Sequence, residues 1–108
     1  MNGVPLARGQ VWWARVDKRR PVLLLSPART LQNRRRVLVA PLSTRLRFND
    51  ATVELGPAEG VPRRSVVNLE NLVSLSRADL DSPLTTLDPR KLRAVCRALA
   101  YATGCAEV

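Results

Sequence analysis

Short apolar runs separated by polar turns fill the first three quarters of the chain, and this pattern predicts β-strands. Two of the runs, Val22–Leu25 and Val37–Leu42, are continuously apolar. The first is typical of a strand buried on both faces, and the second predicts the next central strand. Polar and apolar residues alternate around two tryptophans over Gln10–Val16, which predicts a first strand there. Further short strands are expected at Ala51–Leu55, Ser65–Asn68, Leu72–Leu75 and Leu84–Leu87.

Prolines and small polar residues predict where these strands end. Ser26 and Pro27 directly follow the first continuous run and predict one helical turn as far as Leu31. In this turn Ser26 would be the N-cap and Pro27 would occupy the first helical position. Pro41 lies near the end of the second run, and proline cannot donate a backbone hydrogen bond, so pairing of that strand is expected to stop there.

A longer helix is predicted at the C-terminal end. Asp88 is a favourable N-cap, Pro89 suits the first helical position, and Gly104 suits the residue that ends a helix. Apolar side chains repeat between them at helical spacing, at Leu92, Val95, Cys96 and Leu99. We therefore expect Cys96 to be a small buried thiol on the apolar face of this helix.

These elements together define a fold class. About five to seven short strands, one helical turn and a closing helix indicate a mostly β protein with a C-terminal helix, built on a strongly bent sheet or open barrel. The length of 108 residues fits a single domain over residues 1–108. The apolar runs are far shorter than the ~20 residues that span a bilayer, and the N-terminus lacks a signal-peptide core. We therefore expect a cytoplasmic protein with no membrane partner.

Positive charge is concentrated in the first half of the chain. The formal net charge is +9, and residues 1–50 carry eleven basic and two acidic side chains, whereas residues 51–108 carry seven of each. Only two of the 18 basic residues are lysines, and arginine makes bidentate contacts with phosphate that lysine cannot make. A compositional bias toward arginine can explain that ratio, but not the scarcity of acids in the first half. The distribution indicates a protein that binds polyanions.

The residue types narrow the possible chemistry. The chain has no histidine, and Asp17 and Asp50, the only acids of the first half, form no metal-binding motif. Neither Cys96 nor Cys105 belongs to a Cys-x-x-Cys pair, so we expect no metal ion and no other cofactor. A nuclease of this composition would act on RNA, because RNA carries its own nucleophile, the 2′-hydroxyl. Arginine and hydroxyl groups would then align that nucleophile and stabilise the developing charge.

Four segments, taken in their order along the chain, resemble one known family. They are Arg8–Trp13, Lys18–Pro27, Val37–Arg45 and Arg64–Leu72. Their order and spacing resemble the MazF/PemK toxin endoribonucleases of type II toxin–antitoxin systems, from about Arg8 to Gly104. The resemblance implies an SH3-like small barrel with a C-terminal helix, a fold that the gyrase poison CcdB shares. It also implies a homodimer that binds single-stranded RNA along the subunit interface. Such a toxin cleaves RNA without a metal ion, inhibits translation and growth, and is blocked by an acidic antitoxin.

The resemblance also implies site residues. The family's active site is an arginine just before the second strand and a threonine or serine just after the third, and these positions match Arg20 and Ser43. Arginine stays protonated at neutral pH and is a poor proton shuttle, so we assign Arg20 to charge stabilisation. Ser43 would hydrogen-bond the phosphate and orient the 2′-hydroxyl. Further RNA contacts are expected from Lys18, Arg19, Thr44, Arg45, Arg47 and Asn71.

The chain departs from the family pattern at two places. Asn71 stands where the family often has glutamine, and Val73 where it has arginine, which weakens any role of this segment in reading bases. The long loop between the first two strands is reduced to Asp17–Arg19, as in the family's short-loop branch, which changes the bases that are read. Trp12 and Trp13 point to opposite faces of a strand, so one is expected in the core and the other over the groove or the dimer interface. Spacing does not decide which is which.

Two other functions remain open from the sequence. A gyrase-poisoning toxin of the same fold is expected to end in a Trp-Gly-Ile type sequence, whereas this chain ends with Gly104–Val108 and has no tryptophan there. A non-catalytic SH3-like protein that binds nucleic acid would share the arginine-rich half but would not require Arg20 and Ser43.

Overall fold

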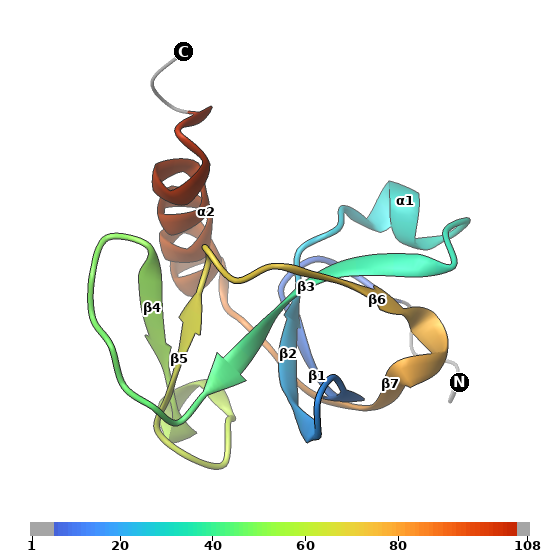
Figure 1. Ribbon diagram of the computed structural model, residues 1–108, viewed down its shortest axis with the longest axis horizontal. Helices are drawn as coiled ribbons and strands as arrows, with labels where there is room; N and C mark the ends of the chain where they lie inside the picture. The colour runs from blue at the N-terminus through green and yellow to red at the C-terminus, as the bar shows by residue number, and fades with distance from the viewer. Residues whose placement is uncertain (1–5, 106–108) are drawn as a thin grey trace.

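Seven antiparallel strands form one continuous sheet in the computed structural model, which describes residues 6–105 (Figure 1). The strands are β1 (Gln10–Arg15), β2 (Arg19–Leu24), β3 (Arg36–Ser43), β4 (Thr52–Leu55), β5 (Ser65–Asn68), β6 (Val73–Ser76) and β7 (Leu80–Thr86). Their order is β4-β5-β3-β2-β1-β7, and β6 also pairs with β3. No pairing joins β4 to β7 within the described residues, so the sheet stays open. The predicted mostly β class is confirmed.

Short helical segments connect some of the strands, and a longer helix closes the fold. They are α1 (Ala28–Leu31), the 3₁₀ helices η1 (Pro57–Glu59) and η2 (Arg77–Asp79), and α2 (Pro89–Thr103). The start of the chain before residue 6 and its ending after Cys105, including part of the C-terminal sequence compared with gyrase poisons above, lie outside the described residues.

The long strand β3 exchanges one neighbour for another at Pro41. Its first half, Arg36–Val39, pairs with β6, whereas Leu42 and Ser43 pair with β5. On its other edge β3 pairs with β2 as far as Pro41, which lies opposite Val22. The prediction that pairing stops at Pro41 is confirmed for the pairing with β2 but is wrong for the strand as a whole, because β3 continues beside β5. The proline, which has no N–H, marks the place where the partner changes.

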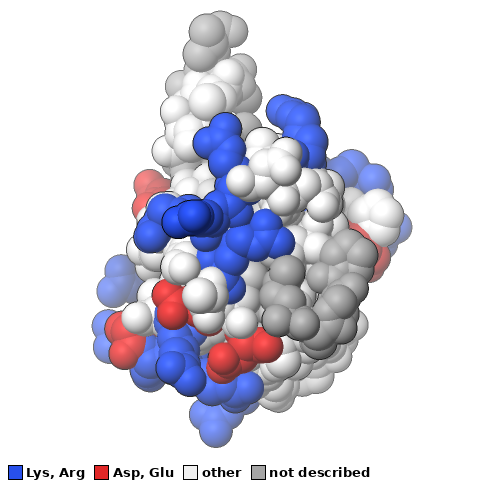
Figure 2. Space-filling view, turned by 90° about the vertical axis from the view of Figure 1, so that its right-hand side faces the viewer, with Lys and Arg blue, Asp and Glu red and all other residues white. Residues whose placement is uncertain are grey.

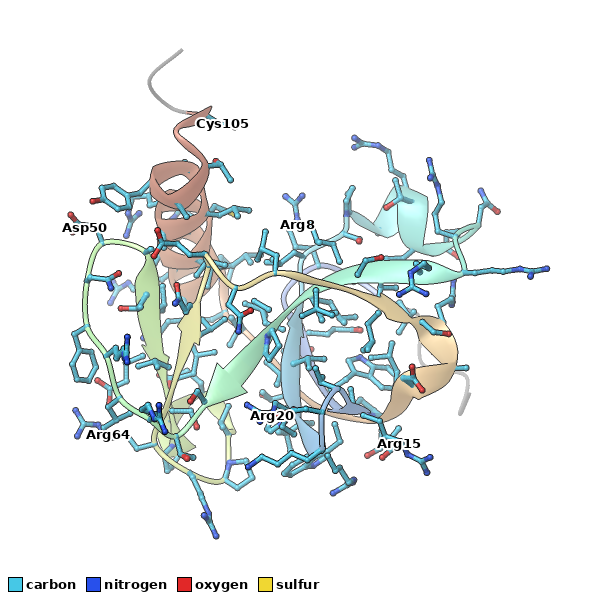
Figure 3. All side chains as sticks on the ribbon, in the orientation of Figure 1. Arg8, Arg15, Arg20, Asp50, Arg64 and Cys105 are labelled. Atoms are coloured by element: carbon cyan, nitrogen blue, oxygen red, sulfur yellow. The ribbon has the colours of Figure 1, made fainter. Side chains whose placement is uncertain are left out.

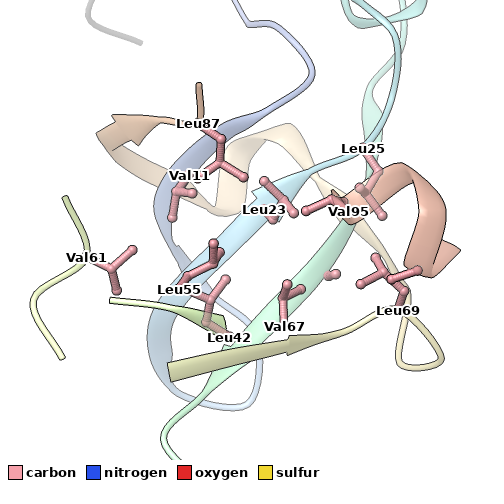
Figure 4. Close-up of a cluster of buried hydrophobic side chains, with 12 residues drawn as sticks. Val11, Leu23, Leu25, Leu42, Leu55, Val61, Val67, Leu69, Leu87 and Val95 are labelled. Carbon is pink, nitrogen blue, oxygen red and sulfur yellow. The ribbon is translucent and has the colours of Figure 1, made fainter. Parts of the chain in front are cut away.

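Strand β2 lies at the centre of the hydrophobic core. Its residues Val22, Leu23 and Leu24 are all fully buried, which confirms the prediction of a strand buried on both faces. Leu23 packs in a cluster that includes side chains from β3, β5 and α2 (Figure 4). Val22 and Leu24 belong to a second cluster on the other face, with Trp12 from β1. Because both faces of the strand are filled, the position of its first residues is strongly constrained.

The two tryptophans of β1 divide between the core and the surface. Trp12 is 1% exposed and packs in the second cluster, and its indole N–H donates a hydrogen bond of 2.9 Å to the side chain of Gln10. Trp13 is only partly buried. The structure thus decides the question that the sequence left open, with Trp12 as the core residue.

The predicted cap of α1 is wrong. Pro27 occupies the N-cap position without a side-chain hydrogen bond, and the helix begins at Ala28. The hydroxyl of Ser26 instead accepts a hydrogen bond of 2.9 Å from the backbone N–H of Leu38. Ser26 therefore ties the end of β2 to β3 and is not available to cap the helical turn.

Helix α2 is capped as predicted but does not bury Cys96. The side chain of Asp88 accepts a hydrogen bond of 2.8 Å from the backbone N–H of Lys91, and Gly104 ends the helix with φ of 71°. The buried helix residues are Val95 and Ala98. Cys96 is exposed because it lies about 100° around the helix from Val95. Within the described residues no helix has the length and hydrophobicity that a transmembrane span requires.

The burial of β2 on both faces makes a testable prediction. Replacement Leu23→Ala should lower the free energy of unfolding by about 2–5 kcal/mol, because it opens a cavity at a fully buried site. Leu38→Ala is the matched control: Leu38 is 40% exposed, and its replacement should cost less than about 1 kcal/mol. Urea denaturation followed by circular dichroism measures both. Equal losses in the two variants would contradict the assignment of β2 to the core.

Candidate functional site

A fork in the sheet opens next to the hairpin of β1 and β2. Arg20 of β2 lies opposite Ala14 of β1, so the first residues of β2 follow β1. The last residues of β3 instead follow β5, with Ser43 opposite Val66. The pairing of β2 with β3 ends at Val22 and Pro41, so the two strands separate toward the start of β2 and the end of β3. Antiparallel register continued past this pair by two residues would place Arg20 opposite Ser43.

A cavity of about 600 Å³ occupies this fork. Its lining residues are Trp13, Lys18, Arg19, Arg20, Pro21, Leu42, Ser43, Thr44, Arg45, Arg63 and Ser65. Six of the eight residues predicted as site residues therefore line one cavity. The other two, Arg47 and Asn71, line an adjoining cavity of about 200 Å³. The two cavities share Ser43 and Arg45 as lining residues, so the predicted site residues lie along one surface.

The guanidinium group of Arg20 is anchored at the mouth of the fork, beside the end of β3 (Figure 3). Its Nη2 lies 2.9 Å from the Asp17 carboxylate, and its Nη1 donates a weaker hydrogen bond of 3.4 Å to the carbonyl of Leu42. The Nε atom is buried and has no hydrogen-bond partner among the described residues. The side chain is 22% exposed, so these contacts hold a cation with only part of its surface in water.

The carboxylate of Asp17 is charged at neutral pH, where it forms the contact with Arg20. A hydrogen bond from its own backbone amide and the positive charge of Arg20 lower the pKa of Asp17 below the ordinary value of an aspartate. Since a lowered pKa keeps the group charged above that value, the contact with Arg20 persists at neutral pH and is lost only when the pH falls through the pKa of the folded state.

Ser43 occupies the opposite side of the fork. Its hydroxyl oxygen accepts a hydrogen bond of 3.1 Å from the backbone N–H of Arg45, which fixes the turn that follows β3. A serine hydroxyl that accepts one bond can still donate its hydrogen to another group. Ser43 therefore offers a donor on the wall that faces Arg20.

Two polar lining residues, Arg63 and Ser65, were not identified as site residues in the sequence. Ser65 is 4% exposed, and its hydroxyl donates a hydrogen bond of 2.9 Å to the carbonyl of Arg63. The sequence contains a signal for Arg63: an arginine pair, Arg63 and Arg64, directly precedes a buried strand, as Arg19 and Arg20 do. Arg63 reaches the cavity because β5, the strand that follows it, pairs with the end of β3. These segments are distant in sequence, so the arginine pair alone does not reveal that Arg63 lies near Arg20.

The cavity is suited to polyanions. Five of its lining residues are cationic and three carry hydroxyl groups, and none is an aspartate, glutamate, histidine or cysteine. Elsewhere in residues 6–105, too, His, Cys, Asp and Glu side chains form no group of three or more that could hold a metal ion. The cavity can bind phosphate through charge-assisted hydrogen bonds, and its hydroxyl groups can orient a sugar–phosphate chain.

A second basic surface lies at the opposite end of β3. Arg34, Arg35 and Arg36 line a separate cavity of about 500 Å³. Figure 2 shows basic side chains in both the upper and the lower part of one side of the molecule, with several acidic side chains among those of the lower part. The strand from Arg36 to Ser43 spans about 23 Å at the usual rise per residue. These three arginines are therefore well separated from the fork.

Comparisons with known proteins find relatives that all belong to one toxin family. Residues 7–103 match the family described as PemK-like, MazF-like toxin of type II toxin–antitoxin system. The protein "Probable endoribonuclease MazF5" of Mycobacterium tuberculosis is 41% identical, with 99% of this chain and 100% of the relative covered. The solved structure "Mycobacterium tuberculosis toxin MazF-mt6" has a TM-score of 0.83 and 27% identity, covering 88% of this chain and 96% of that one.

A further solved structure contains a partner. It is described as "Endoribonuclease in complex with its cognate antitoxin from Mycobacterial species" and has a TM-score of 0.84 and 26% identity. The match covers 92% of this chain and 95% of that one. These matches confirm the fold that the sequence resemblance implied.

The loop that carries Arg63 into the cavity depends on one glycine. Gly60 has φ of +91°, and a Cβ there would lie 2.6 Å from the Thr85 hydroxyl, which donates a hydrogen bond to the carbonyl of Glu59. Gly60→Ala should therefore lower the free energy of unfolding by about 1–3 kcal/mol. Gly56→Ala is the control, because Gly56 has an extended backbone and its Cβ would meet nothing closer than 3.6 Å. It should change stability by no more than about 1 kcal/mol. Thermal unfolding distinguishes the two, and a tolerated Gly60→Ala would contradict this account.

Proposed function

Since the chain belongs to the PemK-like, MazF-like toxins of type II toxin–antitoxin systems, we propose that its endoribonuclease site is the fork between Arg20 and Ser43. We propose that this site cleaves single-stranded RNA in a sequence-selective manner and without a metal ion. The observation that carries the proposal is that the start of β2 and the end of β3 bring these two residues to one cavity with five cationic lining residues.

The reaction uses the nucleophile that RNA supplies. The 2′-oxygen forms a bond to phosphorus, the bond from phosphorus to the 5′-oxygen breaks, and the products are a 2′,3′-cyclic phosphate and a 5′-hydroxyl. The 2′-hydroxyl loses its proton and the departing 5′-oxygen gains one. The protein has to splay a single strand, align the 2′-oxygen with phosphorus, and stabilise charge on the non-bridging oxygens.

Arg20 supplies the charge stabilisation in this proposal. Asp17 and the Leu42 carbonyl hold its guanidinium before substrate arrives, so little reorganisation is needed when charge develops on the phosphate. A guanidinium is a poor proton shuttle at neutral pH, so Arg20 acts as a fixed cation. Ser43 donates a hydrogen bond to the phosphate and orients the 2′-hydroxyl from the other side of the fork.

The rest of the cavity binds the RNA chain. Lys18, Arg19 and Arg45 neutralise phosphates and Thr44 hydrogen-bonds to the backbone, while Arg47 and Asn71 continue the path in the adjoining cavity. Arg63 adds a contact from the β5 side. Each phosphate neutralised in this way makes binding more sensitive to salt.

The proposal extends to partners. By family resemblance the toxin is a cytoplasmic homodimer with RNA along the subunit interface, and its activity inhibits translation and growth. An acidic antitoxin would neutralise the basic fork and compete with RNA there. Support comes from the similar endoribonuclease whose structure includes its cognate antitoxin, and from the charge of the cavity.

Removal of Arg20 tests the site. Arg20→Ala should slow cleavage of a long single-stranded RNA by at least about 100-fold, because a preorganised charge that acts on the transition state is lost. Primer extension maps the cuts, and circular dichroism checks that the fold is retained. Arg29→Ala is the control, since Arg29 is an exposed arginine on α1, outside the fork. Full activity of Arg20→Ala would refute the site, whereas loss in both variants would indicate a general effect of charge.

The chemistry predicts how cleavage responds to chelators and pH. The rate should be unchanged in EDTA, because the proposed groups are arginine and serine. It should also show no inflection near pH 6.5, because the chain has no histidine to titrate there. Single-turnover rates measured with and without EDTA, between about pH 5.5 and about pH 8.5, test both responses. This pH range brackets the titration of imidazole. A strict requirement for magnesium would contradict the mechanism.

A further inference from the structure

Trp13 and Arg19 form a stacked pair on the wall of the cavity. The Cζ atom of Arg19 lies 4.4 Å from the centre of the Trp13 ring, and both residues line the fork. Strand β1, which carries Trp13, lies between β2 and β7. The side chain of Arg19 starts on β2, passes over Trp13, and donates a hydrogen bond of 3.0 Å from Nε to the carboxylate of Asp81. Three neighbouring strands thus hold one guanidinium group in place.

Asp81 reaches this position because of an irregularity in the sheet. Trp13 lies opposite Ser82 and Ala14 lies opposite Leu80, so Asp81 is an extra residue on β7 without a partner on β1. Such a bulge turns a side chain away from the regular alternation, and bulges are common beside active sites. The register shift gives Asp81 its contact with Arg19.

Stability does not explain this arrangement well. The side chain of Arg19 is 55% exposed and that of Asp81 is 33% exposed, and an ion pair in water contributes little to folding. The contacts instead hold the guanidinium in place over the face of the indole. A guanidinium held flat on an aromatic ring presents its other face outward, and unpaired nucleobases stack on both aromatic rings and guanidinium planes.

We propose that Trp13 and Arg19 form a stacking platform for an unpaired nucleobase of the RNA strand whose phosphate lies between Arg20 and Ser43, and that Asp81 is a positioning residue for Arg19. The inference rests on the proposed function, because it assumes that RNA enters the fork. The base stacks on the outer face of the Arg19 guanidinium, which Trp13 supports from behind. The platform grips the base by its face and contributes affinity and alignment, whereas hydrogen bonds elsewhere read its identity.

Binding without cleavage tests the platform. The probes are two short fluorescein-labelled single strands with 2′-fluoro riboses, which offer no 2′-hydroxyl; one carries bases and the other is abasic with the same number of phosphates. The wild-type protein should bind the first about tenfold more tightly, because stacking requires a base. Fluorescence anisotropy measures this preference.

The variants separate stacking from charge. Arg19→Lys keeps the positive charge but lacks the planar guanidinium, so the preference for bases should fall to about twofold or less. Trp13→Leu should have the same effect, whereas Trp13→Phe, which keeps a ring, should retain part of the preference. Asp81→Asn, which leaves Trp13 and Arg19 unchanged, should also reduce the preference for bases. Arg15→Lys is the matched control, because Arg15 is an exposed arginine of β1 that points away from Arg20 and is not a lining residue of the cavity (Figure 3).

The outcomes are distinct from those that test the site. If Arg19→Lys or Trp13→Leu keeps the full preference for bases, the platform is refuted and Arg19 is only a phosphate contact. If Asp81→Asn keeps it, the positioning role of Asp81 is refuted. If the wild-type protein binds the base-bearing strand selectively but cleaves no RNA, the proposed function fails while the platform is supported.

Discussion

The pairing of β2 with β3 is the constraint on which the rest of the structure depends. The two strands run antiparallel and stay together from Leu24 and Val39 to Val22 and Pro41. Beyond Pro41 each follows a different neighbour, so the sheet opens into a fork whose walls carry Arg20 and Ser43. The site is a consequence of strand pairing, and no long loop is needed to assemble it.

The core makes this fork rigid. Val22, Leu23 and Leu24 are buried by two separate hydrophobic clusters, one on each face of β2. A strand packed closely on both faces cannot be displaced without leaving cavities or forcing clashes in both clusters. The charge of Arg20, two residues before this segment, therefore has a fixed position. Fixed charges stabilise a transition state more effectively than charges that must reorganise, which is the physical link between the core and the proposed chemistry.

Much of this arrangement could be predicted from the sequence. The apolar runs predicted the central strands, the pair Asp88 and Pro89 predicted the start of α2, and the resemblance to the family indicated Arg20 and Ser43. These features depend on local patterns or on short motifs. The proximity of Arg20 and Ser43 followed from the family resemblance and not from the apolar pattern. The roles of these two residues are proposals.

The remaining features depend on contacts between distant segments. The contribution of Arg63 comes from a loop that strand pairing brings back to β3, and the bulge at Asp81 is visible only once β1 and β7 are in register. Trp12 and Trp13 could not be told apart by spacing, because alternation fixes opposite faces without saying which is inside. Cys96 was expected to be buried because it belongs to the apolar repeat of the helix. It is exposed, since helical spacing does not show how much of the helix the sheet covers. At Pro41 the sequence could not reveal that a second partner strand takes over.

The central claim is that RNA supplies the nucleophile and the protein supplies fixed charge and alignment. The most direct test is a synthetic RNA that spans a mapped cut and carries a single 2′-deoxy nucleotide at the cleavage position, with the products identified by mass spectrometry. The account predicts that the all-ribose strand ends in a 2′,3′-cyclic phosphate and that the 2′-deoxy strand stays intact at that position. Cleavage of the 2′-deoxy strand at a comparable rate would show that water or a protein group is the nucleophile, and would contradict the mechanism.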